Sequence, residues 1–296
     1  MGTNTLQKHY KYTTASALLY ISLRIIKLMP NNHGRIIVPL LTSSGNLGAV
    51  YGISGRSPES KRRMITVYPE ENRVYVGPIG EITEKQVPVK DLIFYNGMRV
   101  RDDGLLIVTN GAQTDQKVNK EGKPVRNFYD DFDLRDPERS SVAILQDWGY
   151  EDDAFFPPWV GTPRTAMVRY PNGTVCLSMV TKCGDRAVAK AENIATGAGT
   201  RINDGTGLVL STYIGNDEGA IPWYLALQSI GDTLRRYIDF DSNEPVGLAD
   251  ELYRWMDPTY VAATAGAVFD GGKWHFDAVN RHETPESFET EFPPKK

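Results

Sequence analysis

The sequence predicts an α+β protein built mainly from antiparallel strands. Most of the chain between residues 34 and 281 consists of short apolar segments rich in Ile, Val and Leu, separated by Gly, Pro, Asn and Ser. Amphipathic segments with helical spacing occur in only a few places. Runs of strands with helices gathered between them indicate α+β layers, because an alternating parallel fold would need a helix after each strand.

The first half of the chain is expected to form a series of hairpins. The predicted strands of this half are 35–41, 49–54, 65–68, 73–76, 92–95 and 105–109. Turn residues separate them, such as Ser43-Ser44-Gly45-Asn46 between the first two strands. Asn96-Gly97 and Asn110-Gly111 are read as turns that follow strands, since both dipeptides favour turns.

Helices are expected mainly in the second half. Ser140 or Ser141 can cap a helix that runs to Trp148 and leaves Tyr150 and Glu151 at its C-terminal exit. Two further segments with apolar residues at helical spacing are 222–237 and 246–256. The remaining predicted strands are 165–170, 175–180, 208–213, 260–269 and 274–279.

Residues 34–281 are expected to form one domain between two extensions. In the N-terminal extension, residues 1–33, an apolar run at 15–23 follows two lysines as in a signal peptide, but basic residues interrupt it and no small-residue cleavage site follows. The extension is read as a docking helix or as residues added by an upstream start codon. Residues 282–296 are polar and contain proline, which predicts a flexible tail.

Composition and charge limit the classes of function. The 296 residues carry a formal net charge of -4 and a pI of about 5.7, so no overall positive field would hold a nucleic acid. The cysteines, Cys176 and Cys183, are too few for a disulfide framework, which favours a reduced, cytoplasmic protein. The four histidines have no metal-ligand spacing, and the apolar run is too short to span a bilayer. We therefore expect no metal, nucleic acid or membrane partner.

Four short polar clusters in the strand-rich sequence hold the candidate functional residues. They are 55–58 with Arg62-Arg63, 94–97, 108–111, and 150–153 with Thr162-Pro163-Arg164. Together they offer arginines for an anion, a phenol and a carboxylate for proton transfer, and amides for orientation. Such a set suits an enzyme that acts on a small phosphorylated molecule.

Taken one at a time, each cluster also has a structural explanation. Arg56 with Arg62 or Arg63 suits bidentate capture of a phosphate, and suits a solvated basic turn equally well. A tyrosine such as Tyr95 is more often a half-buried strand residue than a catalytic phenol. The acidic residues that begin at Glu151 are first an acidic helix end, although they oppose the helix dipole there.

The order of short motifs along the chain adds specificity that no single motif has. These motifs are Gly34-Arg35, Ser54-Gly55-Arg56-Ser57 with Arg63, Tyr95-Asn96, Thr109-Asn110-Gly111 with Thr114-Asp115, Tyr150-Glu151, Thr162-Pro163-Arg164 and Ser211-Thr212-Tyr213. In this order they resemble the archaeal-type IMP cyclohydrolases and their bacterial relatives, from residue 34 to about 280. The resemblance implies a four-layer αββα sandwich similar to the N-terminal nucleophile hydrolases, without their self-processing chemistry.

The resemblance also implies a reaction and a catalytic pair. Family members close the six-membered ring of the purine base: 5-formamidoimidazole-4-carboxamide ribotide loses water and becomes inosine monophosphate. Tyr95 and Glu151 are the implied carriers of protons, with the roles of acid and base left open. No metal or organic cofactor is implied.

The same resemblance implies a set of substrate-binding residues. These are Arg56 and Arg63 for the ribose phosphate, and Asn96, Asn110 and Arg164 for the base. Arg62 is an alternative to Arg63, because the spacing from Arg56 is longer here than in compact family members.

Two other classes of function stay open. An amidohydrolase of the same fold would use an activated nucleophile such as Ser54, Cys176 or Thr109. A non-catalytic nucleotide-binding protein would use its polar inserts, such as 116–139, to contact partners. The aromatic insert 154–161 is read as a lid over the pocket or as a buried interface, and the second reading permits a homodimer or a larger assembly.

Overall fold

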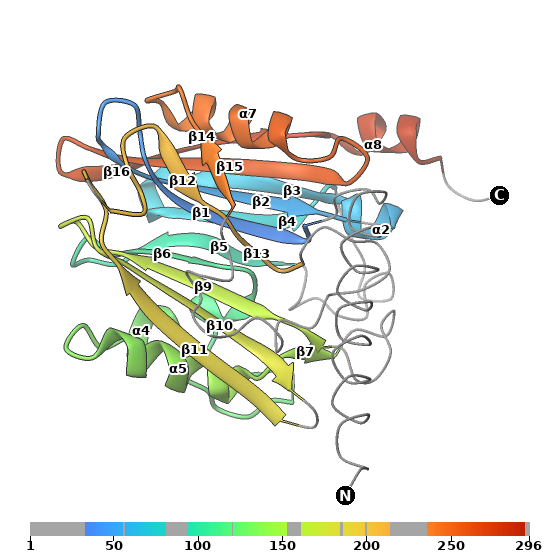
Figure 1. Cartoon of the computed structure of the whole chain (residues 1–296). Helices are drawn as coiled ribbons and strands as arrows, with labels where there is room; N and C mark the ends of the chain where they lie inside the picture. Colours follow the sequence, from blue (N-terminus) through green and yellow to red (C-terminus); the bar gives the residue numbers. More distant parts are fainter. Residues whose placement is uncertain are drawn as a thin grey trace, which may run out of the picture.

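Two antiparallel sheets packed face to face form the centre of the protein. The computed structural model describes residues 33–55, 57–80, 94–119, 121–152, 161–183, 186–198, 200–213 and 236–293. In this part of the chain, helices cover the outer face of each sheet, so the order of layers is helix, sheet, sheet, helix (Figure 1). The predicted α+β class is confirmed, and the two sheets with few helices are compatible with the predicted sandwich.

The first sheet joins strands from both ends of the described chain. Its order is β14-β12-β1-β2-β15-β16, with β13 also paired to β1, and neighbouring strands are antiparallel. Its members are β1 (Arg35–Leu41), β2 (Leu47–Ser54), β12 (Thr206–Leu208), β13 (Leu210–Ser211), β14 (Tyr237–Asp239), β15 (Val261–Asp270) and β16 (Lys273–Asn280). The central strand β2 places Tyr51 between Ile37 and Ala265.

The second sheet is built from the middle of the chain. Its order is β11-β10-β9-β6-β5-β4-β3, again antiparallel throughout. Its members are β3 (Arg63–Tyr68), β4 (Arg73–Pro78), β5 (Tyr95–Val100), β6 (Leu106–Thr109), β9 (Arg164–Arg169), β10 (Val175–Cys183) and β11 (Arg186–Ile194). A separate pair, β7 (Glu151–Asp152) and β8 (Gly161–Thr162), precedes β9 in the chain.

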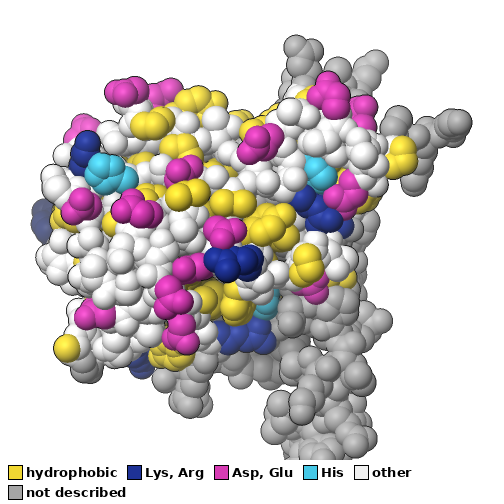
Figure 2. Space-filling view, turned by 90° about the horizontal axis from the view of Figure 1, so that it is seen from above, with side chains coloured by type: hydrophobic (Ala, Val, Ile, Leu, Met, Phe, Trp, Pro, Cys, Tyr) yellow, Lys and Arg dark blue, Asp and Glu magenta, His cyan; other side chains and the backbone are white. Residues whose placement is uncertain are grey.

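The described helices lie outside the sheets. They are α2 (Pro58–Lys61), α4 (Phe128–Asp131), α5 (Pro137–Trp148), α7 (Pro245–Trp255) and α8 (Pro285–Glu291), with the short 3-10 helices η1 (Pro69–Glu71) and η2 (Ala112–Thr114). α7 covers the first sheet, and α4 and α5 cover the second (Figure 1). Seen from the α7 side, charged and apolar side chains are interspersed, and the described residues on this face form no continuous basic surface (Figure 2).

Strand alternation divides the apolar residues among three cores. Residues such as Ile37, Tyr51 and Met167 point between the sheets, whereas their chain neighbours point to the helices. Leu248 and Leu252 of α7 pack on the outer face of the first sheet, and α5 packs on that of the second. The layer between the sheets is thus apolar along most of its length, and its polar groups collect at its ends.

Arg169 lies at one of these ends, where β9 finishes and β2 begins. Its side chain is 0% exposed, and Nη1 donates to the Gly48 carbonyl oxygen at 3.0 Å. Nε and Nη2 have no partner among the described residues. Burial lowers the pKa of Arg169 to about 9, so the group stays protonated at neutral pH.

Several predicted boundaries are wrong, for identifiable physical reasons. Tyr95 opens a strand where the sequence predicted that it closes one, and Asn96-Gly97 lies inside β5 instead of forming a turn. Gly97 is needed within the strand because a Cβ there would lie 2.9 Å from the Tyr51 ring. Helix α5 is capped by Asp136, whose side chain accepts from Arg139 N, and not by either serine.

The C-terminal segment also differs from its prediction. The flexible tail expected from residue 282 is wrong for residues 285–291, which form α8 with a capping box at Thr284 and a buried Phe288. Tyr237 belongs to β14, although the predicted helix 222–237 ends there; residues 222–235 lie outside the described residues. Residues 1–32 of the N-terminal extension and 153–160 of the aromatic insert also lie outside them.

We predict that His33 makes the fold sensitive to acid. Its ring is 3% exposed and stacks on Trp255 with centroids 5.0 Å apart. Burial, followed by the charge of Arg236, lowers the pKa of His33 from 6.5 to about 4. Between these values the unfolded chain binds a proton that the folded chain does not, so stability present above pH 6.5 is lost as the pH falls toward 4, by up to about 3 kcal/mol.

Urea unfolding at pH 7 and pH 4.5 measures this loss. His33→Phe keeps a ring against Trp255 and removes the proton-binding group, so the variant should lose less free energy of unfolding between the two pH values. Equal losses in the two proteins would show that His33 does not carry the effect.

Candidate functional site

Two arginines and three tyrosines gather at the end of the inter-sheet layer where β1 begins and β2 ends. We call them the phenol–guanidinium cluster; its members are Arg35, Tyr51, Arg63, Tyr95 and Tyr213. The charges of Arg35 and Arg63 both act on Tyr51, and all three phenols act on Arg63. Five separate segments therefore bring cations and proton-bearing oxygens to one place.

Arg63 is the most enclosed cation of the cluster. It opens β3, and its side chain is 3% exposed. Its Nε donates to Ser60 O at 2.6 Å and its Nη2 to Ser54 O at 2.8 Å, while no carboxylate among the described residues contacts it. Burial, followed by the charge of Arg35, lowers the pKa of Arg63 to about 10, so it remains a cation at neutral pH. A buried cation without a carboxylate suits an anionic ligand.

The structure distinguishes Arg63 from the alternative, Arg62. Arg62 Nε donates to Ile79 O at 3.2 Å, and its guanidinium lies 5.6 Å from the centre of the Phe288 ring in α8. Its side chain therefore packs toward α8, whereas Arg63 faces the phenols. Arg56 lies outside the described residues.

Tyr95 points into the layer and meets Tyr51 across the two sheets. The phenol oxygens are 2.6 Å apart, and the two side chains are 2% and 0% exposed. Burial, followed by the nearby Tyr95, raises the pKa of Tyr51 well above its usual range. The sequence identified Tyr95 as a candidate and missed Tyr51.

Asn96 faces the opposite side of β5 from Tyr95, as strand alternation requires. Its Nδ2 donates to Asp115 Oδ2 at 2.6 Å, and its Oδ1 accepts from Arg73 at 3.2 Å. Arg99 also contacts that Asp115 oxygen. The role of Asn96 in binding substrate stays a prediction, and the structure does not bring its side chain together with Tyr95.

A buried amide network lies beside the cluster and is centred on Asn110. Its Nδ2 donates to Pro163 O at 2.9 Å and to Thr212 Oγ1 at 3.3 Å. Its Oδ1 accepts from Thr165 N at 2.8 Å and from Gln113 Nε2 at 2.9 Å. All of the hydrogen-bonding capacity of this amide is thus used within the protein, and the side chain joins the two sheets.

Arg164 is the outer member of the amide network. Its Nη1 donates to Gln113 Oε1 at 3.1 Å, and its guanidinium lies 5.2 Å from the centre of the Trp148 ring in α5. The side chain therefore faces the helix layer. Contact of Asn110 or Arg164 with substrate stays a prediction, and Gln113, which links them, was not recognised from the sequence.

The backbone of Glu151 connects to the cluster through one neighbouring strand. In β7 it pairs with Thr162 of β8, and the Thr162 hydroxyl lies 3.0 Å from the Tyr213 hydroxyl. The Glu151 side chain lies outside the described part of the structure. Its predicted role in proton transfer stays a prediction.

The three candidate nucleophiles of the amidohydrolase alternative are buried. Ser54 Oγ donates to Gly34 O at 2.9 Å, and Thr109 Oγ1 donates to Gly111 O at 2.8 Å. Cys176 lies under α5, on the outer face of the second sheet, and burial raises its pKa to about 11. A thiol with this pKa is protonated at neutral pH and is a poor nucleophile.

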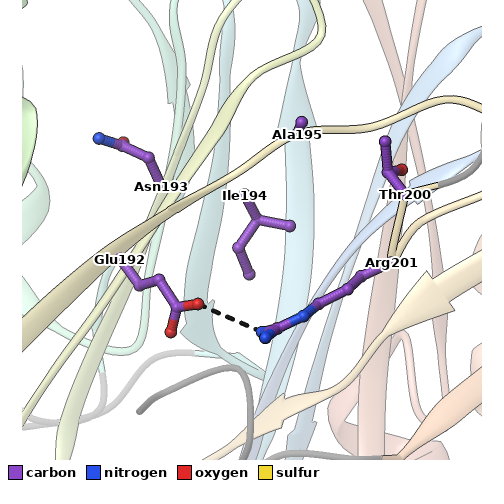
Figure 3. Close-up of a pocket in the computed structure, with 6 residues that line it drawn as sticks. All are labelled: Glu192, Asn193, Ile194, Ala195, Thr200 and Arg201. Atoms are coloured by element: carbon purple, nitrogen blue, oxygen red, sulfur yellow. Dashed lines mark hydrogen bonds and ion pairs between the residues drawn. The ribbon is translucent and has the colours of Figure 1, made fainter.

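A surface pocket of about 290 Å³ lies at the other end of the second sheet (Figure 3). Its lining residues are Glu192, Asn193, Ile194, Ala195, Thr200 and Arg201. Ile194 pairs with Val175, and Val175 pairs with Arg169, so the pocket lies at the level of the last residue of β9. Arg164 lies at the opposite end of that strand. Glu192 and Arg201 in this pocket pair with each other at 3.2 Å. The pocket is therefore separate from the cluster.

The described residues contain neither a group of metal ligands nor a membrane-spanning helix. No three or more His, Cys, Asp or Glu side chains among them are grouped so as to hold a metal ion. No helix among them is long and apolar enough to cross a membrane.

We predict that Asn110 is a major structural residue of the site. Asn110→Ala leaves the buried Thr165 N–H without its acceptor and the Gln113 amide with only its longer bond to Thr165 O at 3.3 Å, which should lower the free energy of unfolding in urea by about 2 to 4 kcal/mol. Asn119→Ala is the matched control, because Asn119 accepts two backbone N–H bonds in an exposed loop, and it should cost less than about 1 kcal/mol. Equal costs would contradict a buried network at Asn110.

Comparison with known proteins assigns the chain to a family. A search of curated proteins finds no match. A family model described as IMP cyclohydrolase-like protein matches residues 33–272. This range covers most of the chain and includes the complete phenol–guanidinium cluster and amide network. The chain therefore belongs to the IMP cyclohydrolase-like protein family.

Proposed function

We propose that the protein is an IMP cyclohydrolase, which closes the purine ring of 5-formamidoimidazole-4-carboxamide ribotide with loss of water. The observation that carries this proposal is the phenol–guanidinium cluster, in which Tyr95 lies beside the buried cation Arg63. Membership of the IMP cyclohydrolase-like family supports the same reaction. The likeness of the fold to the N-terminal nucleophile hydrolases is part of this proposal.

The reaction needs orientation, anion binding and proton transfer. The carboxamide nitrogen is a poor nucleophile, so the site must hold it within reach of the formyl carbon. A C–N bond forms as the formyl oxygen takes up a proton and the nitrogen loses one. The C–O bond then breaks, the hydroxyl leaves as water with a second proton, and a C=N bond completes the ring. Each step moves protons between oxygen and nitrogen, which is general acid–base chemistry.

The residues of the site can be matched to these needs. Arg63, together with Arg56, would bind the ribose phosphate, because a guanidinium offers paired donors to phosphate oxygens. Tyr95 and Glu151 would transfer protons to and from the reacting oxygen and nitrogen. The amide network would fix the position of β9 and β6 around the base.

The amidohydrolase alternative is less favoured by the observations. It requires an activated nucleophile, but the thiol of Cys176 has a raised pKa and lies on the far side of the second sheet. The non-catalytic alternative is distinguished by experiment, because it predicts that inosine monophosphate binds and no turnover occurs.

Tyr95→Phe and Glu151→Gln should each lower the rate of inosine monophosphate formation at least about 100-fold without unfolding the protein, since each removes one proton-transfer group. The assay follows absorbance with the synthetic formamido ribotide, and circular dichroism checks the fold. Full activity in both variants would contradict the catalytic assignment, and absence of turnover in the wild-type protein would contradict the proposed reaction.

Arg63→Met should raise the KM for the ribotide about 10-fold or more, because it removes charge-assisted hydrogen bonds to the phosphate. Arg62→Met is the matched control: the side chain faces Phe288, so the KM should change less than about twofold. Calorimetric titration with inosine monophosphate provides a second readout. The reverse pattern would assign the phosphate to Arg62.

A further inference from the structure

The Tyr51 hydroxyl is held in position from three sides. Tyr51 lies in the central strand β2, where Ile37 of β1 and Ala265 of β15 flank it. Its ring rests on Gly97 of the opposite sheet, so closely that a Cβ at this glycine would lie 2.9 Å from Cε1 and 3.2 Å from Cδ1. Its hydroxyl meets that of Tyr95 at 2.6 Å. Strand pairing, ring packing and a hydrogen bond thus define one location for the oxygen.

The two phenols have one more proton than their shared hydrogen bond uses. Only one of the two hydroxyl protons can lie between the oxygens, and the other must point elsewhere. Neither hydroxyl has a second hydrogen-bond partner among the described residues. A buried O–H without a partner is costly, so the second proton is available for a group that enters the site.

We propose that Tyr51 is a positioning residue for Tyr95: its hydroxyl donates to the Tyr95 oxygen and leaves the Tyr95 proton for the substrate. The inference rests on the proposed function and adds a residue to it. The direction of the hydrogen bond agrees with the surroundings, because burial raises the pKa of Tyr51 and keeps it a donor.

This arrangement gives Tyr95 the role of acid in the dehydration step. As the C–O bond of the intermediate breaks, the Tyr95 proton passes to the departing hydroxyl, which leaves as water. The resulting Tyr95 oxyanion accepts the Tyr51 O–H and lies in the field of Arg63. The proton lost by the ring nitrogen then restores Tyr95. The proton of Tyr51 is never transferred, so Tyr51 orients and stabilises only.

Tyr51→Phe tests the proposal because it removes one oxygen from a fully buried ring. With the formamido ribotide as substrate, kcat should fall about 10- to 100-fold, while KM changes less than about twofold, since the hydrogen bond strengthens as charge forms on Tyr95. Tyr170→Phe is the matched control. Its hydroxyl is buried without a partner among the described residues, near Cys176 and away from the cluster, so kcat and KM should stay unchanged.

A spectroscopic readout separates this inference from the proposed function. In protein labelled with ¹³C at tyrosine Cζ, comparison with Tyr95→Phe identifies the Tyr95 resonance. This resonance should move in Tyr51→Phe, which removes its hydrogen-bond partner, and should stay in place in Tyr170→Phe. The measurement does not depend on turnover. If the wild-type protein is inactive but the Tyr95 resonance moves in Tyr51→Phe, the cyclohydrolase reaction is rejected and the phenol pair is retained.

The proposal is overturned if Tyr51→Phe leaves kcat and the Tyr95 resonance at their wild-type values, or if KM alone changes. Gly97→Ala is the second variant in case Tyr51→Phe does not fold. It retains both hydroxyls and displaces the Tyr51 ring, so it should move the Tyr95 resonance and lower kcat at nearly constant KM. Wild-type values in a folded Gly97→Ala protein would equally reject the proposal.

Discussion

Two antiparallel sheets pack face to face, and this packing determines what every polar group between them needs. The layer is apolar along most of its length and excludes water, so a cation or a phenol placed there needs a partner from the protein or a ligand. At one end Arg169 donates to a backbone carbonyl and contacts no carboxylate among the described residues. At the other end two arginines share a site with three tyrosines. This second end has both positive charge and transferable protons, which the proposed reaction of a phosphorylated substrate requires.

The order of strands explains why residues far apart in the sequence meet. β1 and β13 pair, which brings Arg35 beside Thr212 and Tyr213, and the Thr212 side chain then reaches Asn110 of the other sheet. Arg63 is held by the carbonyls of Ser54 and Ser60, so a short segment of chain fixes its guanidinium against the end of β2. The amide network and the phenol–guanidinium cluster are thus adjacent but differ in kind. The hydrogen-bonding groups of the Asn110 amide are all paired within the protein, whereas one hydroxyl proton of the phenol pair has no partner among the described residues.

Much of the fold could be predicted from the sequence because local signals were strong. Apolar segments bounded by turns located β1, β2, β9 and β15, and apolar residues at helical spacing located α7, to within a few residues. The prediction of a turn at Asn96-Gly97 was wrong because tertiary packing, here against the Tyr51 ring, overrides the local turn preference of this dipeptide. Among the site residues, motif order indicated Tyr95 and Arg63, but Tyr51 occurs in a strand where a buried tyrosine is ordinary. Only the packing of the two sheets against each other brings the Tyr51 hydroxyl to its partner, Tyr95.

The contact between Tyr51 and Gly97 constrains which residues these two positions can hold together. Any side chain at position 97 would collide with a tyrosine ring at position 51, so the two positions are not free to vary separately. A relative with a larger residue at 97 would have to shift the tyrosine ring or replace it with something smaller, and either change would disturb the phenol pair. Relatives that keep both tyrosines in this arrangement are therefore expected to carry glycine at position 97.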